Sequence, residues 1–489
     1  LYIPVINFIK DCFYMKATMS QFLIESKPLL KKLIEELSNE FKYVSVLGSD
    51  SKGEAFSVRK NAVSVSDSFS TERGFVLRVY NGIGYSEYSF NTLDIEEIKK
   101  NIRQIAKDDI EFLKSDNCDI TKYPVIEEEK ITKSFYAEVK ESFNSVTSEQ
   151  KIRRLEKIMK EGFDYCPSMI DFQVRYEEVS VCKIFLSQKK DLEQSYVYAI
   201  SYLIPYLKKG EEVKYSFKAF SGNCGMELLH TVEEAVKTSI DSTMELLQAE
   251  KIKPGVYEII CKQDVTGLIA HEAFGHGVEM DMFVKERAKA KEFINKKVAS
   301  EITDMHDGAA AAEQVSSYLF DDEGTLAQDT QIIEKGILKR GICDMLSALS
   351  LGVKPTGNGK RESFERKAYT RMTNTFFGTK NSTLEEMIKS VNSGYLLDGY
   401  FSGMEDPKNW GIQCAVEKGY EIKDGKLTGK IVGPIFLTGY VPELLSSISM
   451  ISGEEDFQLG GSGFCGKGYK EYVRTSAGGA YIKAVGRLG

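Results

Sequence analysis

Histidine is scarce in this chain, tryptophan occurs once, and long apolar runs are missing. No apolar run reaches the roughly 18 residues that a membrane-spanning helix needs, so we expect no membrane partner. The opening segment, residues 1–9, is apolar but lacks a basic start and a small-residue cleavage site, so we expect no signal peptide. The sequence leaves open whether translation begins at Met15 or Met19.

An excess of basic charge is also missing. The chain has 64 Lys and Arg against 72 Asp and Glu, a net charge of −8. This balance argues against a nucleic-acid partner and makes a DNA-regulating role the weakest interpretation. The nine cysteines form no Cys-x-x-Cys pair and their number is odd, which argues against a disulfide framework. A reducing compartment, by default the cytoplasm, is the expected location.

The composition is that of a folded protein, with 42% hydrophobic and 28% charged residues in 489. Periodicity predicts an α+β fold. We expect an N-terminal lobe of helices and antiparallel sheet and a mainly β C-terminal lobe that carries the metal-site helix. The predicted boundaries are 20–113 for an N-terminal α+β module, 130–249 for a central β-rich module and 250–489 for the C-terminal domain. A helix is predicted to begin at Ser26, and Thr147 with Gln150 predicts a capping box for a later helix.

Two of the four histidines lie close together, in the segment His271-Glu272-Ala273-Phe274-Gly275-His276. An isolated histidine is usually structural, but two histidines bracketing a glutamate are typical of water-activating zinc sites. The spacing is i, i+5, which on a regular α-helix would separate the two side chains by about 140°. A π-type turn, whose hydrogen bonds run from i to i+5, would bring them together. We therefore predict a distorted helix, with Gly275 easing the distortion.

Two histidines leave a catalytic zinc site one protein ligand short. Cys465 is the candidate third ligand, because the glycines around it predict a flexible segment that could bring a thiolate to the metal. Taken alone, such a cysteine is more often an ordinary thiol.

At these residues the sequence resembles the TldD/PmbA family of metallopeptidases, historically also called modulators of DNA gyrase. The resemblance rests on ordered motifs, which are residues 271–281, 321–325, 333–338, 356–362, 371–375 and 465–467. It implies zinc ligands at His271, His276 and Cys465, with Glu272 as general base. Since the His-Glu motif is present, the chain resembles the catalytic TldD type.

The resemblance also implies a zinc-dependent metallopeptidase that hydrolyses unfolded peptides, with one zinc per active subunit. It implies a dimer, either a homodimer or a heterodimer with a related subunit that lacks the motif. A soft thiolate ligand favours zinc, although iron stays open. The alternative function is a non-catalytic metal-binding partner subunit of a peptidase complex.

Five further residues are candidates for supporting roles. Glu279 and Asp281 could accept hydrogen bonds from the imidazole N–H groups, or could be solvated carboxylates. Arg371 and Asn374 could bind a peptide carboxylate or backbone, and Asn358 could line the cleft. Which peptide is cleaved, and at which bond, does not follow from the sequence.

Overall fold

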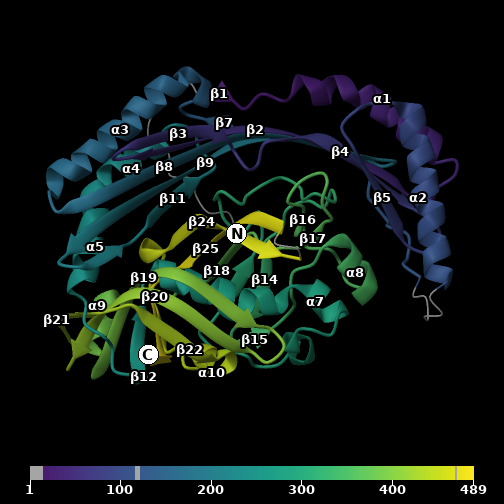
Figure 1. Ribbon diagram of the computed structural model, residues 1–489. Helices are drawn as coiled ribbons and strands as arrows, with labels where there is room; N and C mark the ends of the chain where they lie inside the picture. The colour runs from purple at the N-terminus through teal and green to yellow at the C-terminus, as the bar shows by residue number, and fades with distance from the viewer. Residues whose placement is uncertain (1–14, 116–121, 469–470) are drawn as a thin grey trace.

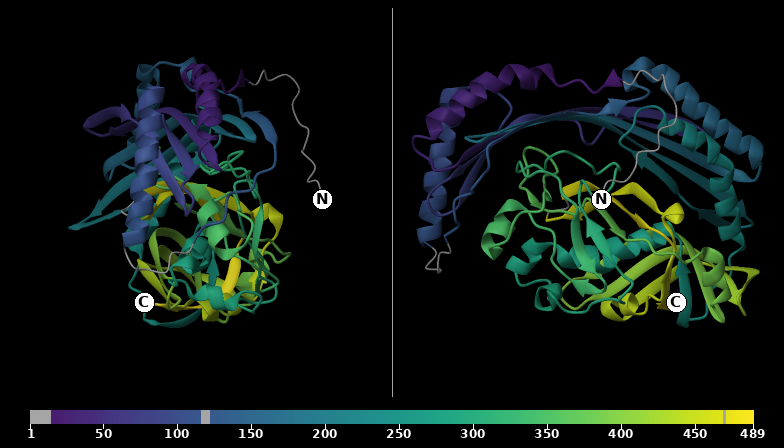
Figure 2. Two further views of the ribbon diagram at one scale, coloured as in Figure 1. Left: turned by 90° about the vertical axis from the view of Figure 1, so that its right-hand side faces the viewer. Right: turned by 180° about the vertical axis from the view of Figure 1, so that it is seen from behind.

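The computed structural model describes residues 15–115, 122–468 and 471–489. The apolar opening segment, Cys12 and Cys118 lie outside the described residues. A long curved sheet with helices on its outer face arches over a C-terminal lobe built mainly of strands (Figures 1 and 2). The α+β fold with these two lobes, predicted from periodicity, is confirmed. None of the described helices is long and apolar enough to cross a membrane.

The N-terminal lobe contains a nine-stranded sheet in the order β10-β9-β8-β2-β4-β5, with β11 and β6 paired to β9 and β3 paired to β2. Its strands are β2 (Val44–Arg59), β3 (Ala62–Asp67), β4 (Glu72–Tyr80), β5 (Tyr85–Phe90), β6 (Ile131–Tyr136), β8 (Met169–Ser187), β9 (Lys190–Lys209), β10 (Glu212–Tyr215) and β11 (Lys218–Gly222). A separate pair joins β1 (Met15–Lys16) to β7 (Glu138–Val139). Because β2 pairs with β8 along most of its length, the predicted modules 20–113 and 130–249 share one sheet.

Helices cover this sheet. They are α1 (Gln21–Leu37), α2 (Ile95–Ser115), α3 (Ser148–Tyr165), α4 (Leu228–Glu234) and α5 (Val236–Gln248). The capping box of Thr147 and Gln150 is confirmed at the start of α3. The predicted start of α1 at Ser26 is wrong: Ser20 caps the helix by accepting from the Leu23 N–H, and Ser26 Oγ instead donates to the Phe22 carbonyl.

The C-terminal lobe combines two sheets. In the first, β12 (Gly255–Cys261), β19 (Ser393–Asp406), β20 (Gly411–Lys423), β22 (Ile435–Tyr440) and β26 (Ile482–Leu488) close into a ring, because β12 also pairs with β26. β21 (Lys426–Val432) and β23 (Met450–Ile451) attach to β20 and β26. The second sheet has the order β15-β14-β13-β18-β25-β24. Its strands are β13 (Met305–Asp307), β14 (Thr330–Glu334), β15 (Ile337–Leu338), β18 (Asn374–Phe377), β24 (Gln458–Lys467) and β25 (Glu471–Gly479).

The remaining elements of this lobe are short. They are the strand pair β16 (Gly359–Lys360) and β17 (Tyr369–Thr370) and the helices α6 (Gln263–Leu268), α7 (Met280–Val284), α8 (Met345–Leu351), α9 (Leu384–Lys389) and α10 (Val441–Ser446).

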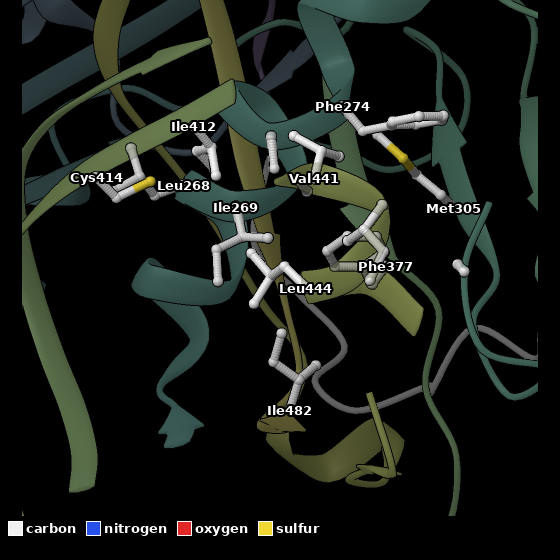
Figure 3. Close-up of a cluster of buried hydrophobic side chains, with 14 of the residues drawn as sticks. Leu268, Ile269, Phe274, Met305, Phe377, Ile412, Cys414, Val441, Leu444 and Ile482 are labelled. Carbon is white, nitrogen blue, oxygen red and sulfur yellow. The ribbon is translucent and has the colours of Figure 1, made fainter. Parts of the chain in front are cut away.

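The largest hydrophobic core of the C-terminal lobe surrounds α6 and the turn that follows it. Leu268, Ile269 and Phe274 pack there with side chains from both sheets and from α10, including Met305 and Leu444 (Figure 3). The helix also lies directly on β25, since a Cβ atom added at Gly267 would be 2.5 Å from the Gly478 backbone nitrogen. The site helix is therefore fixed by the core on several sides.

Replacing Gly267 by Ala should lower the free energy of unfolding by about 1–3 kcal/mol, the usual cost of overpacking a core. The added methyl group meets backbone, which cannot rotate away. Urea unfolding measures the loss. Gly439→Ala is the control, because Gly439 is exposed and its added Cβ would have no neighbour within 4 Å. Equal unfolding free energies for the two variants would contradict the close packing of α6 on β25.

Candidate metal centre

The histidine motif lies on a π-helical turn. α6 ends at Leu268, and residues Ile269–Gly275 continue it as a π-helix in which the His276 N–H donates to the His271 carbonyl. The predicted π-type turn is confirmed. The two imidazole rings consequently face each other edge to face, with ring centroids 5.0 Å apart. Both rings come from one short segment, so the local backbone alone brings them together.

Gly275 serves this turn in a different way from the one expected. Its φ of −61° and ψ of −51° are ordinary helical values, so no special backbone freedom is used. A Cβ atom there would instead lie 2.3 Å from Met372 Sδ. The glycine is needed because the turn packs tightly against its neighbour.

Cys465 completes the group. Its Sγ lies 3.5 Å from His276 Nε2, and the ligand atoms of His271, His276 and Cys465 all lie within 4.8 Å of one another. Zinc–ligand bonds of about 2.0–2.3 Å place neighbouring ligands of a tetrahedral ion roughly 3.3–3.8 Å apart. Cys465 and His276 have this spacing, and the three donors together are close enough to hold one zinc ion after small side-chain adjustments. Cys465 lies on the paired strand β24 rather than on the flexible segment predicted from its glycines.

Cys465 and His276 shift each other's pKa values. Burial raises the pKa of Cys465, but the nearby His276 and His271 lower it well below its usual value. Burial likewise lowers the pKa of His276, whereas Cys465 and Glu279 raise it well above the usual value. The group therefore favours a thiolate at Cys465, and the thiolate is the form of cysteine that binds metal.

Glu272 lies beside the ligands, with its Oε2 4.0 Å from His276 Nε2. The strand β19 holds this side chain from the other side, since a Cβ atom at Gly403 would be only 2.4 Å from Glu272 Cγ. Glu272 is thus placed next to the predicted ligands, as a general base must be.

Lys467 links the strand of Cys465 to the helix of His276. Its ammonium group donates to Glu279 Oε2 at 2.9 Å and to Asp281 Oδ1 at 2.7 Å. Glu279 Oε2 also lies 3.3 Å from His276 Nδ1, so Glu279 is placed to orient that ring. The Asp281 carboxylate, by contrast, accepts from Lys467 and Lys285.

The contacts that Lys467 and Glu405 make near the site were not predicted from the sequence. Lys467 lies two residues after Cys465 on a strand, and that spacing, which puts both side chains on one face, was an available signal. Glu405 accepts from the Gly277 N–H at 3.0 Å, and burial raises the pKa of its carboxyl well above the usual value. No sequence pattern connects Glu405 to a helix more than a hundred residues earlier.

The site opens into a cavity of about 1150 Å³ between the two lobes. His271, Glu272, His276 and Cys465 line one part of it. Other walls come from α5, from residues 216–219 at the start of β11 and just before it, and from β19, β20 and β24. The cavity is large enough to admit several residues of a peptide.

Asn358, Arg371 and Asn374 lie in the interior instead of at the cavity, which differs from the expected contact with substrate. Each is at most 1% exposed. Arg371 donates to the Cys465 carbonyl and, at 3.1 Å, to that of Glu471. Asn358 and Asn374 donate to groups of the neighbouring loops. These contacts support β24 and its surroundings from behind.

Replacing Lys467 by Met should weaken zinc binding by about 10- to 100-fold, the usual effect of losing a group that orients metal ligands. The reason is that Glu279 loses its charged partner. Competition with a chelating dye measures the affinity. Lys285→Met is the matched control, because Lys285 is half exposed and bonds only the outer oxygen of Asp281. Unchanged zinc affinity in the Lys467 variant would show that the link does not position ligands.

The chain is similar to known proteins over its C-terminal lobe. Residues 254–484 match the model of the PmbA/TldA metallopeptidase C-terminal domain. A metalloprotease TldD homolog of Buchnera aphidicola from Acyrthosiphon pisum is 32% identical over 303 residues, which are 60% of this chain and 61% of that relative. A zinc metalloprotease TldD homolog of Saccharolobus solfataricus is 26% identical over 68% of this chain and 74% of its own length.

Solved structures with the same fold extend the likeness to the N-terminal lobe. A Thermotoga maritima protein called a modulator of a DNA gyrase superposes with a TM-score of 0.73 over 95% of this chain and 100% of its own, at 16% identity. TldE from Thermococcus kodakarensis gives a TM-score of 0.69 over 94% and 99%, at 19% identity. The resemblance expected from the sequence motifs is confirmed, and the chain carries the C-terminal domain of the PmbA/TldD metallopeptidase family.

Proposed function

We propose that this protein is a zinc-dependent peptidase that hydrolyses unfolded peptides with Glu272 as its general base. The observation that carries the proposal is the group of His271, His276 and Cys465, with Glu272 beside it, at the wall of a cavity between the lobes. Imidazole and thiolate together suit zinc, and a relative is named a zinc metalloprotease.

The metal and Glu272 have separate roles in the proposed hydrolysis. Zinc, when bound, activates water as a nucleophile and polarises the scissile carbonyl. Glu272 Oε2 accepts the proton of the attacking water and returns it to the departing amine, as one group acting first as base and then as acid. Gly403 and β19 limit where the Glu272 side chain can lie, so the carboxylate is held next to the ligands.

The substrate is proposed to bind as an extended strand. β24 is the last strand of its sheet in the described chain, and residues of it line the cavity on both sides of Cys465. The Gly461 N–H of β24 donates to Ser221 Oγ on β11, so β11 lies beside this part of the strand. The rest of β24, around Cys465, is the part proposed to pair with an incoming peptide. A compact folded protein could not present such a strand, so the proposed substrates are unfolded. The dimer implied by the family resemblance remains part of the proposal, and sedimentation tests it.

The alternative, a partner subunit that binds metal without catalysis, has less support. A structural zinc site normally has four protein ligands, whereas the described residues bring three metal-binding side chains together. Three ligands leave the open position that catalysis needs.

Glu272→Gln should keep one zinc per chain but lose about 10²–10⁴ in the rate of hydrolysis of an unstructured peptide. The amide cannot take up a proton, yet its shape leaves the ligands in place. Metal analysis and a fluorogenic peptide assay measure the two quantities. Glu301→Gln is the control, since the Glu301 side chain is 83% exposed. A variant that hydrolyses peptide at the wild-type rate would remove Glu272 from the reaction.

Cys465→Ala should lose both zinc and activity, because two imidazoles alone hold the ion weakly. Cys224→Ala, at a half-buried cysteine outside the site, should lose neither. Mass spectrometry of the metal content checks both variants. Full zinc occupancy in Cys465→Ala would exclude the cysteine as a ligand. Bound zinc with no hydrolysis of any unfolded peptide by the wild-type protein would instead favour the partner-subunit alternative.

A further inference from the structure

One end of the cavity carries an unusual set of charged groups, away from the metal ligands. The residues are Asp241, Glu245, Lys262, Asp264, Asp398, Glu417 and Lys418. Both lysines are matched by carboxylates: Lys262 bonds Asp398 at 2.8 Å, and Lys418 bonds Glu245 at 2.6 Å. The charge that could attract a ligand therefore resides in the remaining carboxyl groups.

Of the three carboxyl groups that remain, Asp241 accepts from the Tyr165 hydroxyl at 2.8 Å. Asp264 and Glu417 are the other two, and neither forms an ion pair within 4 Å among the described residues. Asp264 accepts from the backbone N–H groups of Val265 and Gly399, at 2.7 and 3.1 Å. Glu417 is 3% exposed, and its hydrogen bond from the described chain is a long one of 3.4 Å, from the Phe217 N–H. Asp264 is exposed to the cavity. The Glu417 carboxyl group, in contrast, is buried, and so few partners make its burial costly unless a ligand completes its contacts.

Two further observations agree. The enclosing protein and neighbouring carboxylates raise the pKa of Asp264 to about 6 and that of Glu417 to about 8, although Lys262 and Lys418 act in the opposite direction. Ser239, on α5, lines the same cavity, is 1% exposed, and its Oγ has no hydrogen-bond partner among the described residues. An ammonium or guanidinium group would supply both the missing charge and the missing donors.

The distance from the metal ligands can be estimated along the helix. Asp264 and His271 are seven residues apart along α6 and the π-helical turn that follows it. At about 1.5 Å per helical residue they are separated by roughly 10 Å. An extended peptide advances about 3.3 Å per residue. A substrate group at Asp264 is therefore about three residues from the bond at the metal.

We propose that Asp264 and Glu417 form a subsite for a positively charged group of the substrate, about three residues from the scissile bond. The group is a Lys or Arg side chain or the free α-amino group of the peptide, since both present the same N–H donors and charge. This inference rests on the proposed peptidase function and names the substrates that such a peptidase would prefer.

The test measures equilibrium binding of fluorescent peptides to zinc-loaded Glu272→Gln, so that it does not depend on turnover. One peptide has a free amino terminus and no basic residue, a second is acetylated and carries Lys at successive positions, and a third is acetylated with Gln in place of Lys. We expect the first or the second peptide to bind about tenfold more tightly than the third, the usual scale of a charge-assisted contact. The peptide that shows the preference identifies the source of the charge.

The preference should fall below about twofold when Asp264→Asn and Glu417→Gln are added, while the neutral peptide keeps its affinity. Glu385→Gln, at a side chain 77% exposed on α9, is the matched control. Thermal melting and zinc content check that each variant folds. If the double variant does not fold, Asp264→Asn alone is tested.

Equal affinity for charged and neutral peptides, or a preference that survives both substitutions, would overturn the subsite. Selective binding without hydrolysis by the wild-type protein would instead overturn the proposed peptidase function and leave the subsite standing.

Discussion

The metal centre depends on one backbone hydrogen bond, from the His276 N–H to the His271 carbonyl. A regular α-helix through this segment would turn the two imidazoles about 140° apart, and no single ion could contact both. The π-helical turn adds one residue to the ring closed by the bond and thereby aligns the rings. Such a turn is unfavourable by itself, so the core around Leu268, Ile269 and Phe274 has to hold it.

Tight packing stabilises the π-helical turn, and it also determines where Cys465 and Glu272 lie relative to that turn. Gly267 lets the helix lie on β25, the neighbour of the strand that carries Cys465. Gly275 leaves room for Met372, and Gly403 brings β19 against Glu272. Each glycine replaces a side chain that would push a ligand or the base away. Close backbone packing therefore fixes the positions of the site residues. Hydrogen bonds of Lys467 and Arg371 also hold β24 in place.

The cavity, in contrast, belongs to both lobes. Lys418 from β20 bonds Glu245 from α5, and the Gly461 N–H on β24 donates to Ser221 Oγ on β11. The C-terminal lobe supplies the three predicted ligands and the base, whereas the arching sheet and its helices close the space in front of them (Figure 1). The proposed recognition of a substrate and the proposed chemistry thus depend on parts of the chain that are distant in sequence.

The sequence by itself determined the fold class, the π-type turn and which side chains are candidate ligands, because these follow from local periodicity, spacing and donor chemistry. It misplaced the start of α1, since Ser26 reads as a cap although its hydroxyl donates backward to Phe22. Only the tertiary structure decided that Asn358, Arg371 and Asn374 are buried, that Glu405 reaches Gly277, and that Asp264 and Glu417 share a cavity. Those contacts join residues up to about 150 positions apart, and no local pattern states which distant strands will meet.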